Sequence, residues 1–557
     1  MILKFSFNYS STSLVYEKII LRTSKLFDLE SSLLRVGDEL LLYVKSEDTD
    51  VLENFANKLS LELPHSIFLH DTQASVVEDM QGDSFHLPQT PKMPMPFCPK
   101  CLEEFMNEEN ENHNNIFHEC EVCGYDVAGE KDNYKEKIQT AANSINDGLT
   151  LEVDAFYGKY YLGKLSAKCK DFDFDVLSYD LYTIENYTNA TKNEIVALGA
   201  MEKPLLKLRR NVKFQMDFEE VTAEFIRFKL ADDFILHLLA VELHKLGVNA
   251  IFMTKEKLFA DVKLSFFETR KFLEPIECVV GENHVAILKG EKGLPYADLN
   301  ANSRKLVPHV GAFFSVVKER NLVDQTVIGI NISRECHNDV LVYSKKFGTI
   351  EYLSFKFEFV SMQEMFNSIA STNATGDKLI SNYKNKYAER FEEISKIKFE
   401  KQKFNVYKLW GVVSIVLGFS KDSNLVNAAK AFEEKANSFL GTKGPRIDYK
   451  VKNVDSKVYL DPLMTIRTVM SFRLAEVDSL TLSYGVIESF VEFLSNQLDE
   501  IKAEMKTDCV VATGSLLGNR RLFSKLSKEV SVNHNLYFNN ELPVDGRNIL
   551  YGGNELF

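Results

Sequence analysis

The first 80 residues change their hydrophobic period twice. The run "DELLLYVKS" (38–46) is short, apolar and rich in strand-forming residues, which predicts a buried strand. The following "DTDVLENFANKLSLEL" (48–63) starts with Asp and Thr and places apolar residues three to four positions apart, which predicts a helix. A second strand is predicted in "HSIFLHDTQASVVE" (65–78). This order predicts a small α/β sandwich.

The remainder of the chain continues this alternation of helices and strands. A proline-rich run, "HLPQTPKMPMPF" (86–97), holds four of the 13 prolines and is interpreted as a linker. After it we predict, in chain order, a helix at 134–148, strands at 149–165 and 194–200, a helix at 234–247, strands at 249–254, 326–333 and 339–357, a mostly helical block at 361–505 and a β-α unit at 508–530. The sequence has no internal repeat.

Length and composition are those of a multidomain globular protein. The 557 residues predict about three to five domains, and 45% of them are hydrophobic. The formal net charge of −14 argues against sequence-independent binding of nucleic acid, because a phosphate backbone is neutralised by Lys and Arg. The first residues lack the pattern of a signal peptide, and no run of 18 apolar residues occurs. A cytoplasmic protein that does not enter a membrane is therefore expected.

Two CxxC pairs stand in "PFCPKCLEEFMNEENENHNNIFHECEVCGYDV" (96–127). This arrangement is the one that wraps four thiolates around Zn²⁺, and it predicts the metal ligands Cys98, Cys101, Cys120 and Cys123. With four protein ligands and no open position, the zinc would be structural. The alternatives are an iron–sulfur cluster, a redox dithiol, or replacement of one thiolate by His113 or His118.

Several further stretches follow the order found in the HypF family of carbamoyltransferases, which act in maturation of the nickel–iron hydrogenase cofactor. "EIVALGAMEKPLLKL" (194–208) is similar to the family's "VLALGAELKNTFAL", and "TGSLLGNRRLFSKL" (513–526) is similar to "SGGVFQNRLLLELL". "LVPHVGAFFSVVKER" (306–320) falls where the family has its metal-binding histidines, and "LPVDGRNILYGG" (542–553) resembles "PPNDGGIALGQ". The resemblance covers most of the chain.

The resemblance implies a multidomain α/β and α+β protein. Its implied parts are an acylphosphatase-like domain at 1–90, a four-cysteine zinc ribbon at 91–128, a truncated YrdC-like segment at 129–190 and a carbamoyltransferase-like domain of the actin-like ATPase type at 191–557. The family's second zinc ribbon has no counterpart, because the chain has no further CxxC. The phosphate cradle of the acylphosphatase domain is also missing, and Arg35 is interpreted as a solvated side chain.

The metal and nucleotide sites that the resemblance implies are altered. His309 keeps the first histidine of the family's H-x-x-x-H motif and Phe313 replaces the second, so His309 and Asp545 form the candidate second metal site. No glycine occurs at 330–339, where the family has a glycine-rich loop. Gly411 replaces an Asp of the family, and Leu425 and Val426 replace a Glu-Gly pair. The candidate nucleotide-binding residues that remain are Gly514, Gly518 and Asn519.

Two main functions follow from the resemblance, and no catalytic residue is assigned for either. The first is a divergent maturation factor of a hydrogenase-type metalloenzyme, which acts by binding a protein partner, either another maturation factor or a metalloenzyme subunit. The second is an active carbamoyltransferase, which uses carbamoyl phosphate, ATP and a divalent cation to modify a partner cysteine. An enzyme with rebuilt chemistry is a third alternative. The kept hydrophobic framework and the lost polar motifs favour the first.

Overall fold

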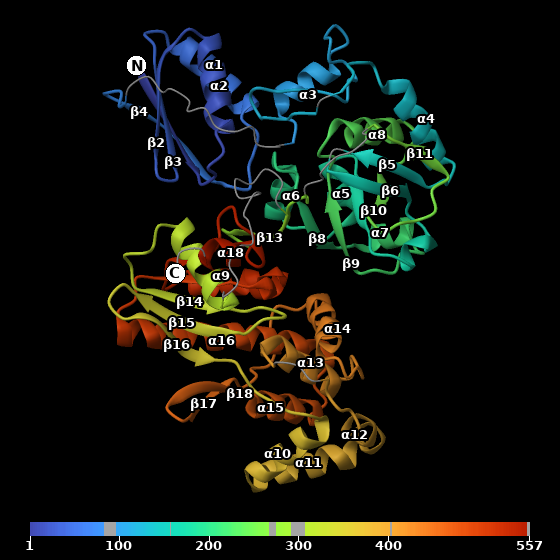
Figure 1. Cartoon of the computed structure of the whole chain (residues 1–557), viewed down its shortest axis with the longest axis vertical. Helices are drawn as coiled ribbons and strands as arrows, with labels where there is room; N and C mark the ends of the chain where they lie inside the picture. Colours follow the sequence, from blue (N-terminus) through green and yellow to red (C-terminus); the bar gives the residue numbers. More distant parts are fainter. Residues whose placement is uncertain are drawn as a thin grey trace. The chain divides into compact units, whose positions relative to one another are not determined.

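The computed structural model describes residues 1–82, 96–127, 129–155, 157–266, 274–290, 307–400 and 404–553. The chain forms two compact units, which are Met1–Cys278 with Lys289–Asp298, and Val279–Leu288 with Leu299–Phe557. Most of the predicted linker at 86–97 lies outside the described residues. Figure 1 labels many of the elements of both units.

The first unit begins with an antiparallel sheet of strand order β2-β3-β1-β4. Its elements are β1 (Ile2–Tyr9), α1 (Val15–Leu26), β2 (Glu30–Val36), β3 (Glu39–Lys45), α2 (Thr49–Glu62) and β4 (Leu69–Val77). The two helices lie side by side against the sheet (Figure 1), where Phe5 contacts Phe55 of α2 and Tyr9 stacks on Tyr16 of α1. The predicted strand–helix–strand is present. The structure adds β1, α1 and β2 before it, which completes a β-α-β-β-α-β order.

Arg35 is not a solvated side chain, which corrects the sequence interpretation. Its Nη2 lies 2.6 Å from Oε1 of Glu17, whose side chain is fully buried. Its Nη1 donates to the carbonyl oxygens of Tyr9 and Ser11 at 3.2 and 3.0 Å. Burial raises the pKa of Glu17, and the nearby guanidinium opposes that rise. The ion pair therefore ties β2 to α1, and the two hydrogen bonds tie β2 to the end of β1 and the turn that follows it.

The second part of the first unit is a mixed sheet with the strand order β11-β5-β6-β10-β7-β9-β8-β12. Its strands are β5 (Leu151–Ala155), β6 (Gly158–Lys164), β7 (Asp175–Ser178), β8 (Leu205–Arg209), β9 (Phe225–Lys229), β10 (Ala250–Thr254), β11 (Val262–Leu264) and β12 (Glu277–Val280). Its helices are α4 (Lys135–Asn146), the 3₁₀ turn Ala167–Lys170, α5 (Leu181–Tyr187), α6 (Lys192–Gly199), α7 (Val212–Asp217) and α8 (Phe234–Lys245).

This sheet does not end near residue 190, where the sequence placed a domain boundary. β7 pairs in parallel with β9, and β12 pairs with β8 through Glu277 and Cys278. The hydrogen-bonded strands thus continue to the end of the unit at Cys278. The expected boundary fell early because the stretch 194–208 resembles the start of another domain of the family, whereas its β8 is a strand of this sheet and its α6 lies in the same unit.

Residues 194–200 form a helix instead of the predicted strand. The hydroxyl of Thr191 accepts the N–H of Glu194 at 3.4 Å, and the carboxylate of Glu194 accepts the N–H of Thr191 at 2.7 Å. This capping box satisfies two N–H groups at the start of α6. It outweighs the strand propensity of the β-branched Ile195 and Val196.

The second unit is built on a mixed sheet of order β17-β18-β16-β15-β14-β19-β20. The strands of this sheet are β14 (Val327–Asn331), β15 (Asp339–Ser344), β16 (Gly348–Ser354), β17 (Lys450–Val454), β18 (Lys457–Asp461), β19 (Cys509–Thr513) and β20 (Leu536–Tyr537). The strand β13 (Val285–Lys289) is not part of it. The helices of the second unit are α9 (Pro308–Glu319), α10 (Met362–Thr372), α11 (Ala374–Lys386), α12 (Ala388–Ser395), α13 (Val406–Leu417), α14 (Leu425–Ser438), α15 (Pro462–Leu474), α16 (Ser479–Met505), α17 (Arg520–Val530) and α18 (Arg547–Gly553).

The core of the second unit is apolar and contains the single tryptophan of the chain. Trp410 of α13 is fully buried and contacts Phe490 of α16, which in turn contacts Phe355 after β16. The predicted helical block is confirmed apart from the hairpin β17–β18. Among the residues that the structure describes, no helix has both the length and the hydropathy required to cross a membrane.

Replacement of Arg35 by Ala should weaken the amino-terminal sheet by about 3 kcal/mol, because it leaves the buried Glu17 without its cation. Hydrogen exchange of the full chain, followed at β1 and α1, measures this loss as faster exchange. The matched control is Lys45→Ala, which removes an ion pair to Glu30 whose two side chains are 50% and 65% exposed. That control should cost less than about 1 kcal/mol. Equal protection in both variants would contradict the role of the Arg35–Glu17 pair.

Candidate functional site

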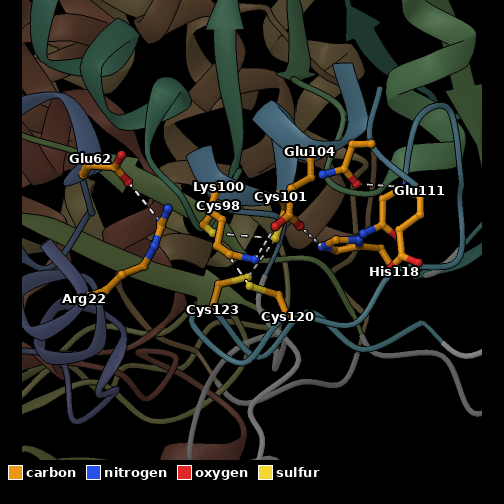
Figure 2. A network of polar contacts seen from close by, with 12 residues as sticks. Arg22, Glu62, Cys98, Lys100, Cys101, Glu104, Glu111, His118, Cys120 and Cys123 are labelled. Atoms are coloured by element: carbon orange, nitrogen blue, oxygen red, sulfur yellow. Dashed lines mark hydrogen bonds and ion pairs between the residues drawn. The ribbon is translucent and has the colours of Figure 1, made fainter. Parts of the chain in front are cut away.

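The four cysteines predicted as metal ligands come together from two turns of the first unit (Figure 2). Cys98 immediately precedes α3 (Pro99–Met106), and Cys101 lies in the first turn of that helix. In the second turn, Cys120 donates its N–H to the Tyr125 carbonyl at 2.8 Å and accepts the N–H of Gly124 at 3.0 Å. Gly124 has φ +74°, which lets the chain reverse directly after the last cysteine.

The sulfur positions fit a single tetrahedral ion. The Sγ atoms of Cys98 and Cys101 lie 3.6 Å apart, and so do those of Cys101 and Cys123. The Sγ atoms of Cys98 and Cys120 lie 4.0 Å apart. A Zn–S distance of about 2.3 Å places tetrahedral sulfurs about 3.8 Å from one another. Each of the four side chains is at most 3% exposed. A buried four-cysteine cluster of this geometry is consistent with structural zinc.

The thiol pKa values show why this cluster calls for a cation. The pKa of Cys120 is lowered, chiefly by its contact with the Cys101 thiol, and the pKa of Cys101 is raised by the same contact. One thiolate therefore opposes the formation of the next. A divalent cation that pairs with all four sulfurs removes this opposition.

The two histidines between the cysteine pairs lie outside the four-cysteine cluster. His118 is buried, and its Nε2 lies 3.4 Å from Oε2 of Glu104, which also pairs with Lys100 (Figure 2). The Nε2 of His113 lies 2.6 Å from the side-chain nitrogen of Asn114. Neither histidine belongs to a metal-sized group among the described residues, so replacement of a thiolate by either one gains no support.

Aromatic rings fix this cysteine segment to the sheet that follows it. Phe97 and Phe105 both stack on Phe234, at the start of α8, with ring centroids 4.6 and 4.3 Å apart. The hydroxyl of Tyr125 accepts the N–H of Phe234 at 3.2 Å. Because Phe97 precedes the first cysteine and Tyr125 follows the last one, the cluster holds both ends of the segment against α8.

The candidate nucleotide-binding turn lies in the second unit, between β19 and α17. Gly514 has φ +104°, and a Cβ at this position would overlap the carbonyl group of Ile332. A Cβ on Gly518 would lie 3.2 Å from the side chain of Leu288. The side chain of Asn519 caps α17 by accepting the N–H of Leu522 at 3.0 Å. The fold therefore has its own use for all three residues, and their contact with a nucleotide stays a prediction.

The backbone N–H groups beside this turn already have acceptors within the unit. The N–H of Ser515 donates to Oδ2 of Asp545 at 3.0 Å, and the hydroxyl of Ser333 donates to the same oxygen at 3.1 Å. In the facing loop between β14 and β15, the N–H of Arg334 donates to Oγ of Ser515 at 3.0 Å, and the N–H of Cys336 donates to Oγ of Ser333 at 3.2 Å. We call the backbone N–H groups of Ser515, Arg334 and Cys336 the loop N–H groups.

The nearest guanidinium is neutralised by a carboxylate of the same unit. Nη2 of Arg334 lies 2.7 Å from Oε1 of Glu433, and Nη1 donates to the carbonyl oxygen of Ser515. Glu433 also accepts the side-chain N–H of Asn519 at 3.1 Å and the hydroxyl of Tyr407 at 3.2 Å. This network joins α13, α14 and α17 across the start of the turn.

Two replacements that set this chain apart from the HypF family lie against each other. A Cβ on Gly411 of α13 would overlap the carbonyl oxygen of Leu425 at the start of α14. Leu425 is fully buried, and Val426 is partly buried against the same core. The two helices therefore approach closely at this point and leave no room for the aspartate of the family.

His309, at the start of α9, lies beside residues that the sequence analysis did not single out. Its Nε2 is 3.2 Å from Oδ2 of Asp339, and His337 lies beside both. Asp545 is not in this group, and its pairing with His309 stays a prediction. Phe313, which replaces the second histidine of the family motif, is 1% exposed in the core.

Sequence reasoning missed the polar residues of the loop between β14 and β15. The stretch "SRECHND" (333–339) stands out in the sequence for its lack of glycine. Neither the contacts of Ser333 and Arg334 nor the His-Asn-Asp sequence at its end was predicted to matter. The dense run of polar residues between two apolar strands was the available signal.

Comparisons with known proteins place this geometry in a context. No family model matches the chain. The chain is 25% identical over 521 residues to Protein HydE of Wolinella succinogenes, across 90% of this chain and 92% of that protein. A crystal structure of full-length HypF in the phosphate- and nucleotide-bound form matches with a TM-score of 0.64 and 14% identity, over 99% of this chain and 97% of that one. HypF of T. kodakarensis matches with a TM-score of 0.61 and 11% identity over the same shares.

These matches confirm the expected resemblance and fold class. The chain has a HypF-like fold over nearly its whole length, with mixed α/β sheets and a cysteine cluster that fits a zinc ribbon. At 14% and 11% identity the structural likeness concerns the fold alone.

Replacement of Cys98 or Cys120 by Ser should remove about one zinc ion per chain, because a serine hydroxyl does not replace a zinc-bound thiolate. Elemental analysis of the purified full chain measures zinc, and hydrogen exchange of segment 96–127 measures the accompanying loss of order. Cys169→Ser is the control, since Cys169 is a buried thiol of the same unit outside the four-cysteine cluster. Unchanged zinc content in both cluster variants would overturn the ligand assignment.

Proposed function

We propose that this chain is a divergent HypF-like factor in the maturation of a hydrogenase-type metalloenzyme, and that it acts by binding a protein partner. The partner is another maturation factor or a subunit of the metalloenzyme. The HypF-like fold supports the first half of the proposal. The internal pairing of the loop N–H groups supports the second half.

Phosphoryl and carbamoyl-phosphate chemistry depends on free donors that meet the charge of the phosphate. In this chain the N–H of Ser515 points to the carboxylate of Asp545, and the N–H of Arg334 points to the hydroxyl of Ser515. A phosphate would therefore have to displace a group of its own charge sign from the turn. The negative charge of the Asp545 carboxylate would repel that of a phosphate at the same N–H group, which opposes phosphate binding.

Arg334 does not compensate for this repulsion. Its guanidinium is paired with Glu433 at 2.7 Å, and the two charges cancel. Burial works to lower the pKa of the Arg334 guanidinium, and Glu433 more than offsets this effect, so that the pKa is raised. Breaking the pair would leave the carboxylate without its cation. The cation that is closest to the turn is thus committed to the fold.

The alternative function, an active carbamoyltransferase using carbamoyl phosphate and ATP, has one observation in its favour. Gly514 keeps a strand-to-helix turn with positive φ, which is where phosphates bind in many α/β folds. That function requires Asp545 to leave the N–H of Ser515 when the nucleotide enters. A divalent cation would have to accompany the ATP.

Structural zinc in the four-cysteine cluster is part of the proposal. It would hold the two turns of the cysteine segment and, through Phe97 and Tyr125, the attachment of this segment to α8. Zinc in a closed site of four sulfurs does no chemistry on a substrate, which agrees with a role in binding.

Neither ATP with Mg²⁺ nor carbamoyl phosphate at millimolar concentration should raise the melting temperature of the full chain. A ligand at 100 times its Kd would stabilise the folded protein by about 2.7 kcal/mol. Fluorescence of Trp410, the single tryptophan, reports the second unit, in which the candidate nucleotide-binding turn lies. A clear rise with ATP, together with carbamoyl-phosphate-dependent exchange of pyrophosphate into ATP, would favour the carbamoyltransferase.

Asp545→Asn should keep the protein functional in cells that lack the wild-type gene. The amide retains an oxygen that accepts the N–H of Ser515 and removes the negative charge, which a binding role does not need and a metal-dependent transfer does. Activity of the hydrogenase-type metalloenzyme in the complemented cells is the measurement. An equally stable Asp545→Asn protein that fails to restore this activity would argue against the binding role.

A further inference from the structure

Two imidazoles and one carboxylate converge at one end of the sheet of the second unit. His309 lies in the first turn of α9, His337 lies in the loop before β15, and Asp339 is the first residue of β15. One ligand atom from each of the three lies within 4.8 Å of the other two. We call this group the His–His–Asp cluster. Only the fold brings the cluster together, because His309 is far in sequence from His337 and Asp339.

The distances in the cluster are those of ligands that share an ion. Nε2 of His309 and Nε2 of His337 lie 3.2 and 3.4 Å from the same oxygen, Oδ2 of Asp339. A transition metal bound at about 2.0–2.2 Å places neighbouring nitrogen and oxygen ligands about 3 to 3.6 Å apart. The ring centroids of the two histidines lie 4.9 Å apart at an angle of 73°, so the imidazoles do not stack.

The carboxylate of Asp339 is not satisfied by hydrogen bonds. Its side chain is fully buried, and neither of its oxygens has a hydrogen-bond partner among the described residues. The two imidazole nitrogens face this carboxylate at 3.2 and 3.4 Å, and they form ion pairs with it only when the histidines are protonated. A buried carboxylate without a partner is strongly unfavourable, whereas coordination needs only that the three lone pairs meet at one point.

We propose that His309, His337 and Asp339 bind a divalent transition-metal ion in the second unit. Neutral imidazole favours ions such as Zn²⁺ or Fe²⁺ over Mg²⁺ and Ca²⁺, which take oxygen ligands. The cluster differs from the site that the family resemblance implies, because it uses His337 and Asp339 and does not include Asp545. The proposal does not rest on the proposed function.

The metal would keep at least one position open. Three protein ligands leave a four-coordinate ion incomplete, and the side chains of His309 and His337 are 19% and 15% exposed. Nε2 of His337 is hydrogen-bonded to Oε1 of Glu351, on β16, at 3.1 Å. A metal ion at this nitrogen would replace that hydrogen bond.

Zinc titration of the full chain tests the proposal. After the four-cysteine cluster is loaded, wild-type protein should take up one further zinc ion per chain, measured by elemental analysis after gel filtration. His337→Ala and Asp339→Asn should not take up this ion. His534→Ala is the matched control, because His534 also pairs with an aspartate, Asp499, at 2.9 Å and belongs to no three-ligand group among the described residues. It should bind the further ion as the wild type does.

Thermal unfolding followed by Trp410 fluorescence gives a second measurement in the same unit. Without added metal, Asp339→Asn should be at least as stable as wild type, since it removes a buried carboxylate that lacks a partner. With zinc, the wild type and His534→Ala should gain stability and Asp339→Asn should gain none.

Three results would overturn the proposal. The first is the absence of a further zinc ion in wild type. The second is its persistence in both His337→Ala and Asp339→Asn. The third is an equal effect of zinc on the melting temperature of wild type and Asp339→Asn, which would assign these side chains a purely structural role.

Discussion

An inward-facing N–H group must meet an acceptor, and in the second unit the acceptors at the ends of β14 and β19 are side chains of the chain itself. Asp545 accepts from Ser515, and the two serine hydroxyls accept from the facing loop. This self-pairing makes a glycine-free loop stable where an empty phosphate site would leave donors unpaired. Two asparagine side chains also hold the path of the loop. Asn405 donates to the carbonyl of Ser333 at 3.1 Å, and Asn331 donates to that of His337 at 2.6 Å.

The first unit likewise depends on side chains that stabilise it only when the fold brings them together. The four cysteines hold two short turns, and the aromatic residues next to them reach Phe234. A segment of this size gains its order from a metal or from a neighbour, and here the geometry provides for both. The four-cysteine cluster and the contact with α8 thus both order this segment.

The sequence was informative where one pattern decides the structure. The CxxC spacing predicted the cluster, and periodicity predicted α2, α8 and the long α16. It failed where two local signals compete, as in α6, where the Thr191–Glu194 capping box prevails over an apolar run that also suits a strand. It also failed for Arg35, whose partner Glu17 is 18 residues away, and for the His–His–Asp cluster, in which His309 is remote in sequence from the other two residues. Only the folded chain shows which of these groups are buried together.

The phenylalanine at position 313, where the family motif has a histidine, shows how the packing of the core limits which residues can be metal ligands. A Cβ on Gly329 of β14 would overlap the ring of Phe313, so the glycine and the phenylalanine fit each other as a pair. A second imidazole on α9 at this position would be surrounded by apolar side chains, including Val317 and Leu341, and would lack a partner. Packing thus excludes the ligand that the family motif would place there. His337 presents an imidazole from the loop instead, beside the one histidine that α9 has kept and the carboxylate of Asp339 that would otherwise stay unpaired.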